Sequence, residues 1–73
     1  MSFGDEGDEP VEISVDCVKR RLARSLICQV EGEEVVLPLS QIMPGGELGA
    51  DAEQGETGTM CIPLWLARDR GLA

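Results

Sequence analysis

Residues 25–39 read Ser-Leu-Ile-Cys-Gln-Val-Glu-Gly-Glu-Glu-Val-Val-Leu-Pro-Leu, two apolar runs joined by a glycine-containing turn. This arrangement is typical of a β-hairpin, and a two-residue turn with glycine first, at Gly32 and Glu33, would be of type II′. The turn would place Val30 opposite Val35 and make one face of the hairpin entirely apolar. We expect that face to lie in the core: Leu26, Cys28, Val30, Val35, Leu37 and Leu39.

The opposite face of this hairpin carries Ile27, Gln29 and Val36. It is apolar enough to be covered by another element or to bind a partner, so Ile27 and Val36 are candidate interaction residues. Pro38 cannot donate a hydrogen bond to a neighbouring strand. The second strand of the hairpin is therefore expected to end at a sheet edge.

Upstream of the hairpin, residues 11–18 alternate between apolar and polar side chains, as a half-buried strand requires. We expect four of them to face the core: Val11, Ile13, Val15 and Cys17. Residues 19–24 are too short and too charged for an independent helix and are interpreted as a basic connection. Its four cations either neutralise the flanking acidic segments or contact nucleic acid, and they are candidate interaction residues: Lys19, Arg20, Arg21 and Arg24.

The last fifteen residues, 59–73, predict a strand, a short helix and a glycine stop. Pro63 suits the first helical position, where its missing N–H would have no partner anyway. Gly71 suits the left-handed position after a helix, with Leu72 folding back in a Schellman-type cap. The helix must pack on the sheet, through Trp65 or Leu66. Trp65 is interpreted first as a core residue and, alternatively, as an anchor for a partner.

Two segments are expected to contribute little to the core. Residues 1–10 hold four acidic side chains and are predicted to form a disordered acidic tail. Residues 44–58 contain five glycines and four acidic side chains and are predicted to form a flexible acidic loop. The remaining chain, residues 11–73, is expected to form a single small β domain.

The composition argues against several classes of chemistry. The 73 residues include no histidine, which removes Ser-His and Cys-His nucleophiles and imidazole metal ligands. The three cysteines show no CxxC spacing and are interpreted as core thiols, with a disulfide or a reactive thiol as the alternatives: Cys17, Cys28 and Cys61. We expect no enzyme, no catalytic residue, no metal site and no cofactor. We also expect neither a membrane span nor a signal peptide, and a cytoplasmic location.

The net charge of −8 indicates which partners the chain favours. A negative field repels nucleic-acid phosphates and attracts basic proteins. The chain is therefore expected to be an acidic, non-catalytic interaction module that binds a basic protein partner or associates with itself through an edge strand, with no small-molecule substrate. The alternative is a small β-barrel that binds nucleic acid through residues 19–24.

Two resemblances accompany this interpretation. Residues 26–72 include an acidic Glu-Gly-Glu-Glu hairpin, Pro-Leu-Ser-Gln-Ile, and then Gly-Thr-Met-Cys-Ile-Pro-Leu-Trp-Leu-Ala before a final Gly-Leu. In these motifs the chain resembles a group of small uncharacterised phage and mobile-element proteins, which implies a mobile-element setting. Residues 39–42, Leu-Ser-Gln-Ile, are similar to the turn after the third strand of S1-type OB barrels, although the aromatic and basic RNA-binding face of that family is not present.

Together these patterns predict a mainly β fold. We expect a small antiparallel sheet, or a partly open SH3-like or OB-like barrel, of four or five strands with one short C-terminal helix.

Overall fold

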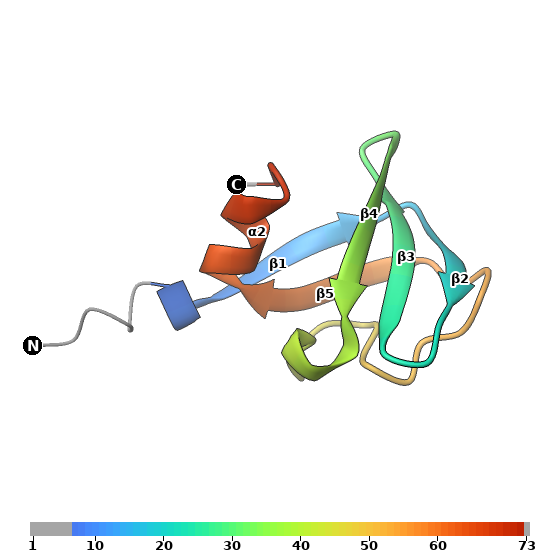
Figure 1. Cartoon of the computed structure of the whole chain (residues 1–73), viewed down its shortest axis with the longest axis horizontal. Helices are drawn as coiled ribbons and strands as arrows, with labels where there is room; N and C mark the ends of the chain where they lie inside the picture. The colour runs from blue at the N-terminus through green and yellow to red at the C-terminus, as the bar shows by residue number, and fades with distance from the viewer. Residues whose placement is uncertain (1–6, 73) are drawn as a thin grey trace, which may run out of the picture.

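The fold is mainly β, as expected, with five strands in two antiparallel sheets and one short C-terminal helix (Figure 1). The structure is a computed structural model that describes residues 7–72. Strands β1 and β5 form one sheet, and strands β2, β3 and β4 form the other in that order. The two sheets stay partly open and do not close into a barrel. The elements are β1 (Pro10–Val15), β2 (Cys17–Arg21), β3 (Ser25–Val30), β4 (Glu33–Pro38), the 3₁₀ turn η1 (Leu39–Gln41), β5 (Gly58–Pro63) and α2 (Leu64–Asp69).

The two-stranded sheet joins the two ends of the described chain. Its register runs from the pair Pro10 and Pro63 to the pair Val15 and Gly58. Helix α2 contacts both strands, above which Figure 1 shows it. The other side of β5 is met by bridges from Met43 and Leu48, so residues that precede β5 also line its edge.

The chain passes from one sheet to the other at Asp16, which divides the strand expected over residues 11–18. Asp16 N–H donates to Gln29 O (2.7 Å), and the alternation of buried side chains changes there. Val15 and Val18 are buried, whereas Cys17 is half-buried, so the prediction that Cys17 faces the core is wrong. The sheet change and a bulge between Val18 and Arg20 both reset the two-residue period, which sequence alternation alone cannot show.

The expected basic connection is also shorter than predicted. Strand β2 continues to Arg21, so Lys19, Arg20 and Arg21 belong to a strand and only residues 22–24 connect it to β3. Pairing with β3 overrides the local preference of these charged residues for a loop.

The hairpin turn lies one residue earlier than predicted. Glu31 and Gly32 both have positive φ (53° and 82°), which is the type I′ turn, and the predicted glycine-first turn is wrong. The type I′ turn matches the twist of the flanking strands, and Asp16 Oδ2 accepts from Gly32 N–H (3.2 Å). Cys28 therefore pairs with Val35, and the predicted pairing of Val30 with Val35 is also wrong.

The face predicted to be buried is nevertheless correct for the five residues that lie in the strands. Moving the turn by one residue shifts every partner by two, and an even shift leaves each side chain on the same face. The buried set is Leu26, Cys28, Val30, Val35 and Leu37. Leu39 lies beyond the strand in η1 and is only partly buried against this core.

Helix α2 begins at Leu64, with Pro63 as its N-cap and as the last residue of β5, one position later than predicted. Its end forms the expected Schellman cap. Leu72 N–H donates to Ala67 O (2.7 Å), Gly71 N–H donates to Arg68 O (3.1 Å), and Gly71 has a φ of 77°.

The side of α2 that faces the sheet carries Leu66 and Ala67. Leu66 is 1% exposed, whereas Trp65 is 44% exposed, so the interpretation of Trp65 as a core residue is wrong. A Cβ atom on Gly7 would lie 3.5 Å from Trp65 Cβ, which places the backbone before β1 against one side of the tryptophan. Only one side of a helix can face the sheet. Trp65 lies outside the side formed by Leu66 and Ala67, so it stays exposed despite its hydrophobicity.

Residues 44–58 are attached to the sheets at several points. Leu48 and Ala52 are buried in the core, and Leu48 N–H donates to Thr59 O (2.7 Å). The flexibility predicted for this loop stays a prediction. Of the predicted disordered tail, residues 1–6 lie outside the described part, while Pro10 already belongs to β1. No helix in residues 7–72 is long and apolar enough to cross a membrane.

Candidate interaction surface

Three of the seven predicted interaction residues meet in one row across the three-stranded sheet. Arg20 pairs with Ile27, and Ile27 pairs with Val36. Ile27 and Val36 lie on the face opposite the core, because their sequence neighbours Leu26 and Leu37 are buried on the other side, and Arg20 shares this face through its pairing with Ile27. Val36 is 45% exposed, Arg20 is exposed and Ile27 is half-buried. The row therefore offers an apolar strip with a cation at one end.

The other three basic candidates lie near this row, but they differ in their contacts. Lys19 sits in the β2 bulge and Arg24 in the turn before β3, and both are exposed. Arg21 instead donates through Nη1 to Ala50 O (2.8 Å) and Ala52 O (2.9 Å). Arg21 thus holds the 44–58 segment against the sheet, and it is a structural residue.

None of the four basic candidates forms an ion pair within residues 7–72. Direct neutralisation of the flanking acidic side chains, one reading of the sequence, does not occur in that part of the chain. The seventh candidate, Trp65, lies on α2 and is not part of the row. The row and the exposed tryptophan are separate features.

Strand β4 forms an edge of its sheet, as Pro38 predicted. Within residues 7–72 it pairs with β3 alone. In a two-residue hairpin the residues next to the turn, Val30 and Glu33, exchange both hydrogen bonds, and the pattern then alternates. Leu39 N–H donates to Arg24 O (2.9 Å), in phase with this alternation. The backbone groups of Glu34, Val36 and Pro38 therefore point away from β3.

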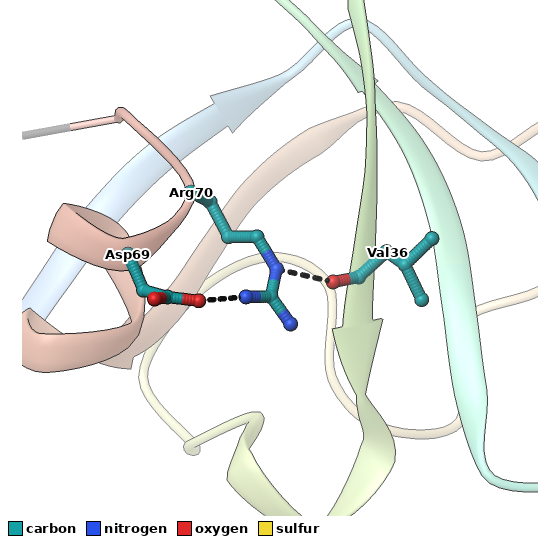
Figure 2. A network of polar contacts seen from close by, with 3 residues as sticks. All are labelled: Val36, Asp69 and Arg70. Atoms are coloured by element: carbon teal, nitrogen blue, oxygen red, sulfur yellow. Dashed lines mark hydrogen bonds and ion pairs between the residues drawn. The ribbon is translucent and has the colours of Figure 1, made fainter.

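One contact on this edge was missed by the sequence analysis. Arg70, just after α2, donates through Nε to Val36 O (2.9 Å), and its Nη1 pairs with Asp69 Oδ2 (Figure 2). The contact confirms that Val36 O points outward. No local sequence pattern links Arg70 to Val36, which lies 34 positions earlier in the chain.

Charge is separated along the three-stranded sheet. Glu31, Glu33 and Glu34 are exposed around the β3–β4 turn, and none of them forms an ion pair within the described residues. Arg24 lies in the β2–β3 turn, and successive turns of an antiparallel meander lie at opposite ends of the sheet. The end nearest the β3–β4 turn is therefore acidic, whereas Arg24 lies at the opposite end.

The three thiols are free and differ in burial. Cys28 is buried, and Cys17 and Cys61 are half-buried. Burial raises the pKa of Cys28 from 9.0 to about 11, with a smaller contribution from Cys17 nearby. A raised pKa lowers the thiolate fraction at neutral pH and hence the reactivity of Cys28. Residues 7–72 contain no cluster of three or more cysteine or acidic side chains that could hold a metal ion, and no pocket is found among them.

Comparison of the chain with known protein families, with curated proteins and with solved structures finds no match. Function is therefore inferred from the geometry and charge described above.

Proposed function

We propose that this chain is a non-catalytic interaction module whose acidic sheet end binds a basic protein partner. The observation that supports the proposal is the grouping of Glu31, Glu33 and Glu34, exposed and without cation partners in the described chain, beside the β4 edge. Unpaired carboxylates beside free backbone groups suit a cationic polypeptide, which supplies both positive charge and amide donors.

The charge of the whole chain favours the same class of partner. With a net charge of −8, long-range attraction brings basic proteins toward the molecule and raises their rate of association. This attraction is screened over about 8 Å at physiological salt, so the local carboxylates determine where the partner docks. Binding should therefore weaken, but persist, as salt is raised.

A second candidate function, nucleic-acid binding, is favoured by the exposed Lys19, Arg20 and Arg24, which form no ion pair within residues 7–72. Proteins that bind single strands usually add aromatic side chains on which bases stack. The exposed aromatic residue of the described chain, Trp65, lies on α2 and outside the sheet row. This function is therefore the weaker of the two.

The biological setting belongs to the same proposal. The resemblance of residues 26–72 to small phage and mobile-element proteins supports a mobile-element origin, and a reducing cytoplasm would keep the three thiols free. No cofactor and no small-molecule substrate take part in the proposed function.

The experiment is a binding titration of the whole chain with four fluorescent probes at physiological salt. The probes are a short peptide in which lysine and valine occupy alternate odd positions with threonine between them, its glutamate counterpart, a single-stranded oligonucleotide and a duplex. We expect the lysine peptide to bind, with salt-dependent affinity, and the other three to bind at least tenfold more weakly.

The outcomes separate the candidates. Failure of the lysine peptide to bind would contradict the proposal. Nucleic-acid affinity that persists at physiological salt and is lost in Arg20→Ala would favour the second candidate. Sedimentation velocity of the chain alone is the third arm, because concentration-dependent dimers without any probe would favour self-association over a basic partner.

A further inference from the structure

We infer that the basic partner binds as an added β-strand on the outer edge of β4, and that Arg70 occupies this edge until the partner displaces it. The inference rests on the proposed function, since it specifies where and how a basic polypeptide docks. It names one occupant, an extended segment with a lysine or arginine and an apolar residue two positions apart.

The edge offers the backbone groups that strand addition needs. The alternation fixed by the β3–β4 register leaves Glu34 N–H, Glu34 O and Val36 N–H pointing outward. No backbone partner for these three groups is present within residues 7–72. Pro38 has no N–H to donate, so the row of backbone hydrogen bonds available to an added strand ends there.

A further outward group, Val36 O, is the one that Arg70 occupies. Its Nε–H stands in the position that a backbone N–H of an added strand would take, and Figure 2 shows the guanidinium lying against the edge between α2 and β4. The Asp69 carboxylate pairs with the same guanidinium. The molecule thus binds a cationic donor of its own at this edge, and an incoming strand must compete with it.

The side chains beside the edge define the sequence that would fit. Glu34 and Val36 are two residues apart, so both lie on the outer face of the sheet, and both are exposed. Directly paired side chains on neighbouring strands stabilise a sheet when they combine opposite charges or two apolar groups. A partner strand would therefore place a basic residue opposite Glu34 and an apolar residue opposite Val36.

The first test uses two N-methylated forms of the lysine–valine–threonine peptide, methylated at the odd or at the even backbone amides. All three peptides carry the same charge. Strand addition uses alternate amides of the peptide, so one methylated form should lose at least tenfold in affinity while the other binds nearly as the parent does. Equal affinities for all three peptides would leave acidic-surface binding intact and overturn strand addition.

The second test compares two arginines at the same end of α2. Arg70→Ala removes the competing donor and should tighten peptide binding about fivefold, as expected for the loss of one hydrogen bond of ordinary strength. Arg68→Ala makes the same change in net charge at an exposed residue for which no side-chain hydrogen bond to the edge is seen, and it should change affinity less than twofold. Equal effects of the two variants would overturn the role of Arg70.

The third test addresses the carboxylates. Glu34→Gln should weaken binding about threefold, whereas Glu12→Gln, an exposed residue on β1 of the other sheet, should leave it unchanged. Thermal melts of each variant verify that it is folded. The methylated peptides use the unmodified protein, so they decide the inference even if a variant unfolds. If the parent peptide does not bind at all, the proposed function fails and this inference fails with it.

Discussion

The two sheets of this small protein differ in how their edges are used. In the sheet of β1 and β5, α2 contacts both strands and bridges from Met43 and Leu48 line the free side of β5. In the sheet of β2, β3 and β4, the described residues add no strand to β4, and one arginine side chain contacts its edge. The β5 edge of the first sheet is therefore covered by residues of the domain itself, whereas the β4 edge of the second sheet is exposed.

This difference matters because a domain of this size has little stability to spare. A chain of 73 residues buries only about 60% of its unfolded surface, so an edge that is not used for folding is a cost. Exposed edges also invite aggregation, which charged residues and proline oppose. The edge of β4 carries Glu33, Glu34 and Pro38. We interpret β1, β5 and α2 as the stabilising half and the β4 edge as the binding half.

The largest effect should come from breaking the stabilising half at α2. Leu66→Ala removes a fully buried side chain and should lower the free energy of unfolding by about 3 kcal/mol. Its neighbour Trp65 is 44% exposed, and Trp65→Ala should cost about 1 kcal/mol or less. Urea denaturation of the two variants measures the difference. A larger loss of unfolding free energy for Trp65→Ala than for Leu66→Ala would indicate that the tryptophan is a core residue and would contradict the structure.

The next effect tests the segment that lines β5. A Cβ atom on Gly46 would lie 2.8 Å from Thr59 O and 2.9 Å from Met60 Cα, which are rigid backbone atoms. Gly46→Ala should therefore push this segment off the strand and cost about 2 kcal/mol. At Gly49 the nearest atom is the flexible Asp51 Oδ1, at 3.2 Å, so Gly49→Ala is the matched control and should be nearly neutral. Equal stability of the two variants would argue that residues 44–58 do not dock as described.

A smaller effect should appear as a loss of stability in alkali. Burial raises the pKa of Cys28 from 9.0 to about 11, so between these values the unfolded chain has released a proton that the folded chain retains. The stabilisation is complete below about pH 9 and is lost as the pH rises toward about 11, so that the free energy of unfolding should fall by about 1 kcal/mol between neutral pH and pH 10. Denaturation under reducing conditions at several pH values measures how steeply the free energy of unfolding falls with pH. Cys28→Ala should reduce this slope. An unchanged slope in the variant would assign it to other groups.

The smallest effect separates two neighbouring arginines. Arg21 donates to Ala50 O and Ala52 O, and Arg21→Ala should cost about 1 kcal/mol and increase the exchange of amides in residues 44–58. Arg20 is exposed on the outer row, and Arg20→Ala should leave both properties unchanged. Equal behaviour of the two variants would remove the distinction between a structural arginine and a surface arginine.

The features that the sequence predicts well depend on local periodicity and end signals. The alternation through Ile13 and Val15 identifies the buried face of β1, and Gly71 with Leu72 identifies the helix end. The buried face of the β3–β4 hairpin is predicted even though its turn is placed wrongly, because an even shift of register leaves the faces unchanged. Local chemistry suffices for these features.

The features that the sequence does not predict depend on contacts between distant residues. The change of sheet at Asp16 is stabilised by the backbone of Gln29, and Trp65 is excluded from the core by the orientation of its helix. The candidate edge was predicted in part, through Pro38 and Val36, but its contact with Arg70 joins two parts of the chain that no pattern connects. Such contacts follow from the tertiary arrangement and leave no periodic signal.

Amide hydrogen exchange along β4 tests the division into two halves most directly. In the free protein we predict slow exchange at Val35 and Leu37, whose N–H groups point to β3, and fast exchange at Glu34 and Val36. Saturating lysine peptide should slow exchange at Glu34 and Val36 and leave Val35 and Leu37 unchanged. Slow exchange at Glu34 and Val36 in the free monomer, or no change on binding, would contradict the assignment of the β4 edge as the binding half.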